Sequence, residues 1–310
     1  MSDGHDHHGV APTPDPTSGH YGILVEHALP DESWTDRWDR IVVPDAVKQR
    51  MVNFGLFALT QRTDRSQVAL PVHGLLLLQG PPGTGKTTLA RGLADQVARR
   101  IKELDGRETL FAEVDAHSIG SGVLGESQRQ VDRVFQRSVR LLARQGKPVV
   151  VLIDEVENLA VSRDRASLQA NPTDVHRATN AVLTGIDTIW TQFTNVLFVA
   201  TSNFPGSIDA AFLSRVDLVI DVPVPPRDLA REILLDTMGE IAGAEAMHPT
   251  GEEEAALEAV LDAVTGADAR RLRKLLLEAI VERSETASDP AALRWEHVRQ
   301  AVDAKTSAIS

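Results

Sequence analysis

A glycine-rich segment, GPPGTGKT at residues 80–87, constrains the fold of this chain more than any other feature. It lies between an apolar run and a stretch of helical periodicity, the context that the pattern G-x-x-x-x-G-K-S/T requires. Glycines let the backbone wrap around phosphates, Lys86 supplies positive charge, and Thr87 offers a hydroxyl to magnesium. The alternative is a turn that merely joins strand to helix, but the lysine and threonine in register favour a nucleotide site. The candidate nucleotide-binding residues are Gly80, Pro81, Pro82, Gly83, Thr84, Gly85, Lys86, Thr87 and Thr88.

Short apolar runs alternate with helical periods through the first two thirds of the chain. Strands are predicted at residues 74–79, 109–115, 149–154, 195–200 and 216–221. Helices are predicted at residues 45–60, 86–102, 126–145 and 174–189, with a short one at 209–213. Because strands separated by helices need right-handed crossovers, we expect an α/β fold with a parallel sheet. The nucleotide is expected at the carboxyl ends of its strands.

Composition divides the chain into three predicted parts. Residues 1–32 are predicted to form a flexible leader, because the first 20 are rich in Gly, His, Pro, Asp and Ser and show no apolar period. Residues 33–223 form the predicted large α/β ATPase domain. Helical stretches without a strand follow, so residues 224–310 are predicted to form a small, all-helical lid domain. The leader histidines, to which we assign no function, are His5, His7 and His8.

Polar side chains follow two of the predicted strands. Asp154 and Glu155 end the third strand, where Asp154 would hold magnesium and Glu155 would polarise an attacking water. A helix cap is the alternative for this acidic pair. Asn203 follows the fourth strand, so its amide would reach a terminal phosphate or the water. Before a Phe-Pro-Gly sequence an Asn is equally typical of a turn, but its position beside the other elements favours function.

Two arginines are candidates for contact with a bound nucleotide. Arg215 lies just before the last predicted strand, where it would point into the site of a neighbouring subunit. The alternative is a surface pair with Asp209 or Asp217, and the spacing does not choose between them. Arg270 lies on a basic face of a helix in the lid. Such a face is usually solvated, but an arginine there would report the nucleotide to the small domain.

Charge and composition narrow the classes of ligand. The 310 residues carry 44 acidic and 32 basic side chains, a formal charge of -12 that disfavours a nucleic-acid partner. Only 4% of residues are aromatic, which leaves few platforms for stacking bases. The chain has no cysteine, so disulfides and thiolate chemistry are excluded. Because no apolar run reaches bilayer length and no signal peptide is evident, we expect a cytoplasmic protein without a membrane partner.

Several stretches resemble one superfamily of ATPases. The loop GPPGTGKT, the strand VVVLIDE and the TSN at 201–203 are shared widely among AAA+ ATPases, whose order of elements this chain resembles after residue 30. WDRIVVPDAVKQRM, LIDEVENL, TDVHRATNAVLTGID, SNFPGSIDAAFLSRVD and RRLRKL are similar to the AAA+ remodellers of HORMA-domain proteins, the pachytene checkpoint protein family with its bacterial relatives. The resemblance implies the following roles: sensor one for Asn203, a finger acting in a neighbouring subunit for Arg215, sensor two for Arg270, and adenine contacts for Val42 and Val43.

The resemblance also implies a hexameric ring that pulls an extended protein segment through a central pore. The loop at 115–126 matches the pore-loop position. Family relatives carry an aromatic residue there, whereas Val123 and Leu124 occupy the place in this chain, so an aliphatic grip is expected. The alternative is that both residues pack a glycine-rich connection. Larger eukaryotic relatives carry a folded N-terminal domain that recruits substrate, and the short leader expected here leaves recruitment open.

The main hypothesis is a homo-hexamer that uses ATP and Mg²⁺ to unfold or open a HORMA-domain protein. In bacteria, the resemblance implies that such an ATPase restrains a second-messenger antiphage system. One alternative is a AAA+ remodeller of another assembly, as in activases of carbon-fixing enzymes. Another is a nucleotide-gated scaffold that assembles without mechanical work. A DNA motor fits the acidic balance poorly.

Overall fold

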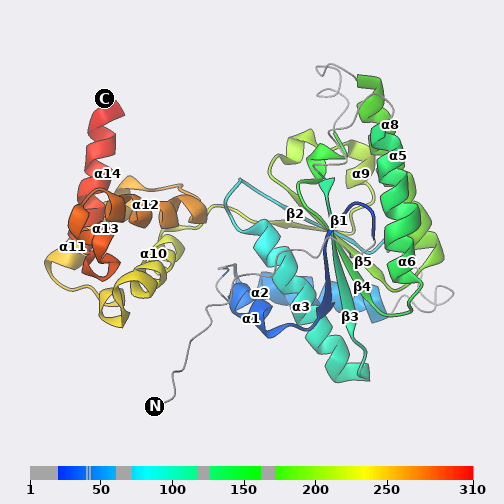
Figure 1. The fold of residues 1–310 in the computed structure, drawn as a ribbon, viewed down its shortest axis with the longest axis horizontal. Helices are drawn as coiled ribbons and strands as arrows, with labels where there is room; N and C mark the ends of the chain where they lie inside the picture. The colour runs from blue at the N-terminus through cyan, green and yellow to red at the C-terminus, as the bar shows by residue number, and fades with distance from the viewer. Residues whose placement is uncertain are drawn as a thin grey trace, which may run out of the picture.

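The computed structural model describes residues 20–39, 41, 43–60, 72–116, 126–161 and 172–309. They form a six-stranded sheet flanked by helices, with a further group of helices beside it (Figure 1). The strand order is β1-β3-β4-β5-β2-β6. The strands are β1 Ile23–Leu29, β2 Leu75–Gln79, β3 Thr109–Val114, β4 Val149–Ile153, β5 Val196–Ser202 and β6 Leu218–Asp221. All five predicted strands are therefore present, with small shifts at their ends.

Strands β2 to β6 run parallel, as the alternation of strands and helices predicts. Every residue of β4 is buried, as expected for a central strand covered by helices on both faces. In the register of the sheet, Gln79 of β2 pairs with Ser202 of β5, and Ile153 of β4 pairs with Ala200. The carboxyl ends of these three strands therefore lie side by side, and the candidate site residues begin there.

Strand β1 corrects the prediction that residues 1–32 form a flexible leader. It runs antiparallel along β3 at the edge of the sheet. Leu29 is 1% exposed, and the ring of Trp34 stacks on His27 with 5.5 Å between ring centroids. Most side chains of β1 are only partly buried, and its sequence, ILVEHAL, is not a continuous apolar run. Pairing with β3 and packing on Trp34 order a segment whose composition alone does not indicate a strand. Residues 1–19 lie outside the described residues.

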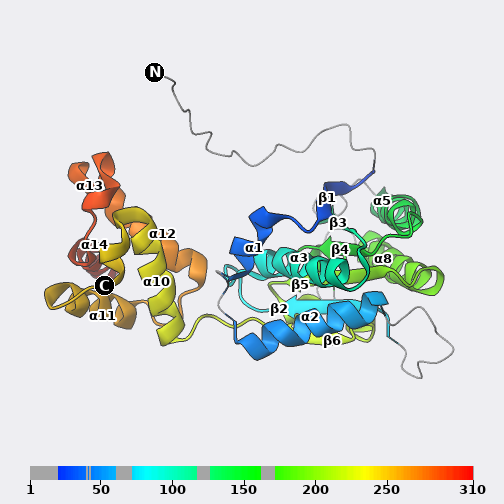
Figure 2. The ribbon, with the colours of Figure 1, turned by 90° about the horizontal axis from the view of Figure 1, so that it is seen from below.

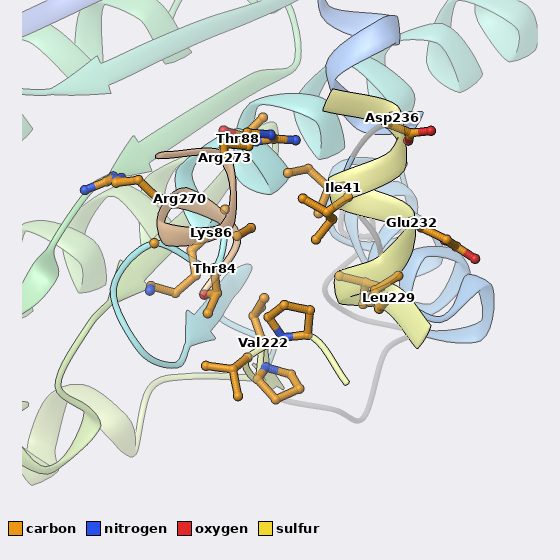
Figure 3. A pocket seen from close by; sticks show the side chains of 18 of the residues that line it. Ile41, Thr84, Lys86, Thr88, Val222, Leu229, Glu232, Asp236, Arg270 and Arg273 are labelled. Atoms are coloured by element: carbon orange, nitrogen blue, oxygen red, sulfur yellow. The ribbon is translucent and has the colours of Figure 1, made fainter. Parts of the chain in front are cut away.

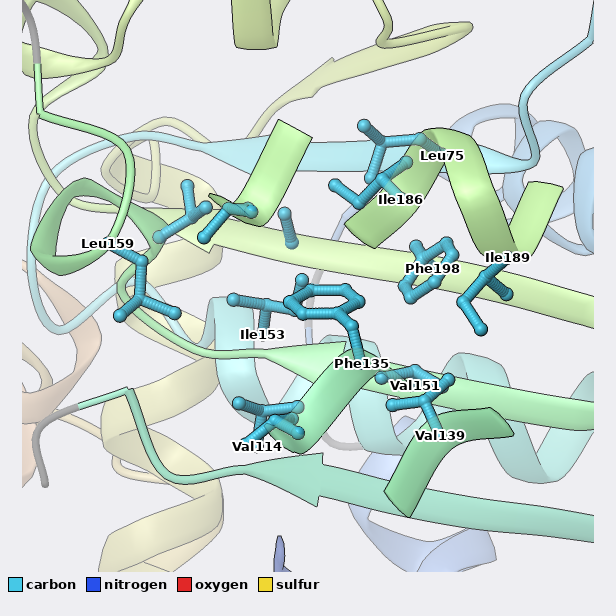
Figure 4. Packing of buried hydrophobic residues seen from close by; sticks show 14 of the residues in the cluster. Leu75, Val114, Phe135, Val139, Val151, Ile153, Leu159, Ile186, Ile189 and Phe198 are labelled. Carbon is cyan, nitrogen blue, oxygen red and sulfur yellow. The ribbon is translucent and has the colours of Figure 1, made fainter. Parts of the chain in front are cut away.

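Helices cover both faces of the sheet (Figures 1 and 2). One face carries α1 Glu32–Asp39, α2 Asp45–Thr60 and α3 Lys86–Asp105. The other carries α5 Glu126–Arg133, η2 Val134–Val139, α6 Arg140–Ala143, α8 Pro172–Gln192 and α9 Ala210–Leu213. The helix predicted at 126–145 thus contains a π-helical segment, η2. Phe135 of η2 packs near Phe198 of β5, with 6.0 Å between ring centroids, inside this second layer (Figure 4).

A second group of helices follows β6 and lies to one side of the sheet (Figure 1). Within the described residues 227–309 no strand occurs, as predicted. The apolar side chains of this group, including those of Leu276 and Trp295, form a core separate from the two cores of the sheet. No helix in the described part of the chain is long and apolar enough to cross a membrane. The elements are α10 Arg227–Ala242, η5 Ala244–Met247, α11 Glu252–Ala263, α12 Ala269–Val281, α13 Ser284–Ser288, η6 Pro290–Ala292 and α14 Trp295–Ile309.

Candidate functional site

A cavity of about 1620 Å³ lies between the carboxyl ends of the strands and the C-terminal helices. Figure 3 shows Lys86 and Thr84 of the glycine-rich loop on one side, with Leu229 and Glu232 of α10 across from them. Ligand pockets commonly measure about 300–1,000 Å³, so this cavity has room for a nucleoside triphosphate. The predicted site residues that line it are Val43, Pro82, Gly83, Thr84, Gly85, Lys86, Thr87, Thr88, Asp154, Glu155, Asn203 and Arg270.

The glycine-rich loop owes its path to close backbone contacts. Gly80 and Gly83 have φ angles of 151° and 81°, which residues with a Cβ rarely adopt. A Cβ on Gly80 would lie 2.1 Å from the carbonyl oxygen of Val222, just beyond β6. A Cβ on Gly83 would lie 2.0 Å from a carboxylate oxygen of Asp268, the N-cap residue of α12. The loop is therefore in contact with both the α/β region and the C-terminal helices.

Lys86 is buried within the loop that precedes it. Its Nζ donates hydrogen bonds to the carbonyl oxygens of Gly80 at 2.9 Å and Pro81 at 2.6 Å. Burial lowers the pKa of Lys86, while nearby carboxylates raise it, with the strongest such effect from Glu157. An ammonium held inside a glycine-rich loop, at the N-terminus of a helix, provides a site for phosphate oxygens.

Thr87 and Asp154 meet at the point where magnesium is expected. The hydroxyl of Thr87 donates to Oδ1 of Asp154 at 2.8 Å, and Thr201 donates to the same oxygen at 2.5 Å. Hydroxyl and carboxylate oxygens suit Mg²⁺, which takes its other ligands from water and substrate phosphates. Among the described residues no group of three or more His, Asp or Glu side chains could hold a metal by itself.

Glu155 has a left-handed backbone, with φ of 49° and ψ of 57°. It is the only non-glycine residue of the described chain with positive φ, and such strain, of about 1–3 kcal/mol, is concentrated at functional sites. Its Oε1 accepts a hydrogen bond from Nδ2 of Asn203 at 3.0 Å, and Oε2 accepts one from Asn158 at 3.2 Å. Glu155 occupies the N-cap position of the following turn, η3 Val156–Asn158, but its side chain makes no capping hydrogen bond, so the helix-cap alternative does not account for this side chain.

Asn203 follows β5 directly, because the strand extends to Ser202 and not only to residue 200. Its side chain reaches Glu155 beyond the neighbouring strand, which the turn alternative does not explain. Its backbone N–H donates to Oε1 of Glu157 at 2.9 Å. Two residues that the sequence analysis did not single out therefore belong to the site. Thr201 belongs to the TSN segment, whose resemblance to AAA+ ATPases could have pointed to it. No feature of the sequence distinguished Glu157 from a solvent-exposed acid.

The predicted arginines take different positions. Arg270 lines the cavity from α12 (Figure 3). Arg215 is not among the described residues that line it. Instead, its guanidinium donates to both carboxylate oxygens of Asp187 on α8, at 2.8 and 2.7 Å. Asp209 caps α9, and Asp217 accepts two backbone N–H groups near the start of β2. The ion-pair partner of Arg215 is therefore Asp187, and not Asp209 or Asp217 as the spacing suggested.

The remaining predicted contacts fall partly outside the described residues. Val43 is 8% exposed and lines the cavity, as does Ile41, which was not predicted. Val42 lies outside the described residues. The same holds for Val123 and Leu124, so the pore-loop assignment stays a prediction.

Three comparisons relate this site to known proteins. Residues 76–224 match the family described as "ATPase family associated with various cellular activities (AAA)". CD-NTase-associated protein 6 of Pseudomonas aeruginosa is 41% identical over 283 residues, which cover 91% of each chain. A pachytene checkpoint protein 2 homolog of Oryza sativa subsp. indica is 35% identical over 219 residues. That match covers 70% of this chain and 46% of the relative, so this chain spans about half of the relative's length.

A solved structure supports the same relationship at the level of the fold. A chain from the structure of the E. coli MS115-1 HORMA:CdnC:Trip13 complex superposes with a TM-score of 0.73. The match covers 91% of this chain and 94% of that chain, and the 20% identity shows a shared fold alone. Fold, site geometry and sequence identity lead to one conclusion. The chain belongs to the AAA ATPase family, together with CD-NTase-associated protein 6 and the pachytene checkpoint protein 2 homologs.

Proposed function

We propose that this chain is the subunit of a hexameric, magnesium-dependent ATPase that opens or unfolds a HORMA-domain protein. The observation that carries the proposal is the meeting of three groups at one cavity: Lys86 in its loop, the Thr87–Asp154 contact and the Asn203–Glu155 contact. These groups follow the carboxyl ends of the neighbouring parallel strands β2, β4 and β5, so the sheet fixes their relative positions. ATP hydrolysis needs such positioned charges more than it needs covalent chemistry.

The proposed reaction transfers the γ-phosphoryl group of ATP to water. Loop N–H groups and Lys86 bind the phosphates. Thr87 and Asp154 would hold Mg²⁺, which neutralises charge on the phosphate oxygens when bound. Glu155 takes a proton from the attacking water. At the same time the water oxygen bonds to the γ-phosphorus, and the bond between the γ-phosphorus and the β–γ bridging oxygen breaks. ADP and phosphate are the products, and Asn203 orients the carboxylate of Glu155.

The ring is proposed from the family and from the place of Arg215. This arginine is paired with Asp187 and does not line the cavity of its own subunit, which suits a group that acts on the nucleotide of a neighbouring subunit. An arginine of this kind stabilises charge in the transition state, so hydrolysis depends on assembly. Because β1 belongs to the same sheet as the predicted range 33–223, residues 23–223 are proposed as the large domain and residues 224–310 as the lid domain. Arg270 of the lid is proposed to report the bound nucleotide as the cavity closes.

The substrate class is proposed from the relatives. A chain of the same fold was solved in a complex named for HORMA, CdnC and Trip13, and the Pseudomonas relative is named as CD-NTase-associated. We therefore propose that the ATPase inactivates a HORMA protein and so restrains a second-messenger antiphage system. Val123 and Leu124 are proposed to grip an extended segment of that protein. We propose a cytoplasmic protein without nucleic-acid or membrane partners.

Peptide release from a closed HORMA–peptide complex tests the proposal. With MgATP, wild type is expected to release the peptide, and Glu155→Gln is expected to bind ATP and hydrolyse it about 10²- to 10⁴-fold more slowly. Glu108→Gln is the control. Glu108 pairs with Lys147 on the surface, just before the amino end of β3, whereas the site lies at the carboxyl ends of the strands. Release by Glu155→Gln as fast as by wild type would end the remodelling proposal. ATP-dependent assembly with turnover unaffected by substrate would favour the scaffold instead.

A further inference from the structure

Glu157 lies in the candidate site, yet the reaction described above gives it no role. It belongs to the short turn η3 that follows β4, two residues after Glu155. Its Oε1 accepts the backbone N–H of Asn203 at 2.9 Å. Its Oε2 is buried and has no hydrogen-bond partner among the described residues. A buried polar atom without a partner costs about 1–3 kcal/mol, so this placement needs an explanation beyond packing.

The bond between Glu157 and Asn203 links two parts of the site. Asn203 is the first residue beyond β5, where the sheet no longer holds the backbone. Its side chain donates from Nδ2 to Oε1 of Glu155 at 3.0 Å. Holding the backbone N–H of Asn203 therefore determines where its amide meets the carboxylate of Glu155. An error of about 1 Å in such a contact can reduce the rate by about 10²-fold.

We propose that Glu157 is a positioning residue of the ATPase site, which holds the backbone of Asn203 and thereby sets the contact between Asn203 and Glu155. The inference rests on the proposed ATPase function and adds a residue to it. Glu157 also acts on Lys86 more strongly than Asp154 or Glu155 does, raising the pKa of that lysine against the effect of burial. The carboxylate thus lies within electrostatic reach of the phosphate-binding lysine and is not a remote surface acid.

Two substitutions separate the reach of the Glu157 side chain from its charge. Glu157→Gln keeps an acceptor oxygen at the same distance along the side chain but has no charge. Glu157→Asp keeps the charge but is one methylene shorter. We expect kcat for ATP hydrolysis to fall about 10- to 100-fold in Glu157→Asp and to stay near wild type in Glu157→Gln. KM for ATP is expected to be unchanged in Glu157→Asp, and unchanged or lower in Glu157→Gln, because a negative charge near the phosphates is removed.

Melting temperature and MgADP affinity complete the test. The melting temperature is expected to stay near wild type in both variants, since the bond positions a group and supports no core side chain. MgADP affinity is expected to be unchanged in Glu157→Asp, and unchanged or higher in Glu157→Gln. Glu103→Ala is the control, because Glu103 is an exposed acid that pairs with Arg100 on α3. Full kcat in Glu157→Asp, or an equal loss in Glu157→Gln, overturns the inference while the ATPase proposal stands. A wild-type protein without ATPase activity overturns both.

Discussion

The α/β region and the C-terminal helices of this ATPase carry their charged groups in different ways. In the α/β region, Glu113 is 5% exposed and accepts hydrogen bonds from Nε and Nη2 of Arg91, at 2.7 to 3.1 Å. In the helical region, Arg299 pairs with Glu296 on the surface, at 2.6 Å. Buried bidentate pairs fix geometry, whereas surface pairs contribute little to stability. The Arg91–Glu113 pair therefore helps to hold α3 against β3, whereas the Arg299–Glu296 pair adds little to the packing of the helices.

The two regions meet at the glycine-rich loop. Gly83 touches Asp268 of the helical region so closely that no Cβ fits between them. Arg270 lines the cavity from the same helix, while Asp154, Glu155 and Asn203 come from strand ends. The groups proposed for the chemistry thus lie in the α/β region, whereas Arg270, which is proposed to report the bound nucleotide, lies in the helical region. Mutations should separate hydrolysis from closure.

The largest effect is expected from Arg215→Ala. Loss of the proposed finger should reduce ATP hydrolysis about 10³- to 10⁵-fold and leave ATP binding unchanged. Mixing provides the measurement: Arg215→Ala subunits keep a complete site and Glu155→Gln subunits keep the arginine, so only mixed rings should regain turnover. Full-rate hydrolysis by Arg215→Ala alone would show that the finger lies elsewhere. Asp187, the lost partner, is partly exposed, so folding should be nearly unaffected.

Substitutions in the separate cores should be next in size. Trp295→Ala removes a side chain that is 1% exposed in the core of the helices, which should cost about 3–5 kcal/mol. Hydrogen exchange should accelerate in α10 to α14 and change little in β4 and β5. The matched variant, Phe198→Ala, should have the converse effect, because Phe198 lies in a core of the sheet. Equal acceleration in both regions by either variant would show that they unfold as one unit.

A moderate effect is expected from Gly83→Ala at the contact between the regions. The added Cβ would meet Asp268 and would also strain a backbone with φ of 81°. We expect nucleotide affinity to fall about tenfold, equivalent to about 1.4 kcal/mol, as measured by MgADP titration. Combining it with Asp268→Ala should recover part of the loss, because the clash is with that side chain while the strain remains. Wild-type affinity in Gly83→Ala would mean that the loop binds phosphate without this contact.

The smallest effect is expected from the surface pair of Glu296. Hydrogen bonds from Arg299 and then Gln300 lower the pKa of Glu296 from 4.5 to about 2. A lowered folded-state pKa means that the pair stabilises the protein above about pH 4.5 and loses this effect as the pH falls toward 2. Wild type should therefore melt slightly above Glu296→Gln at pH 6, and this difference should shrink as the pH falls. A difference that grows on acidification would contradict the assignment.

Local patterns in the sequence carried much of the fold and the site. The segment 80–87 predicts its own conformation, because glycines, lysine and threonine act within eight neighbouring positions. Asp154 and Asn203 could be placed because parallel strands bring their carboxyl ends to one edge. Strand β1 was missed because an edge strand with partly exposed residues lacks an apolar run. The partner of Arg215 was missed because Asp187 is 28 residues away, on α8, while Arg215 lies beyond the end of α9.

The sequence by itself determined the alternation of strands and helices from β2 to β6, the phosphate-binding loop and the acids that follow β4, because periodicity and turn chemistry are properties of neighbouring residues. Only the tertiary structure decided that Asn203 holds Glu155, that Glu157 holds Asn203, and that Asp268 touches Gly83. Each of these contacts joins residues that lie far apart in the sequence. Their geometry depends on how the sheet and the helices pack, which no local pattern encodes.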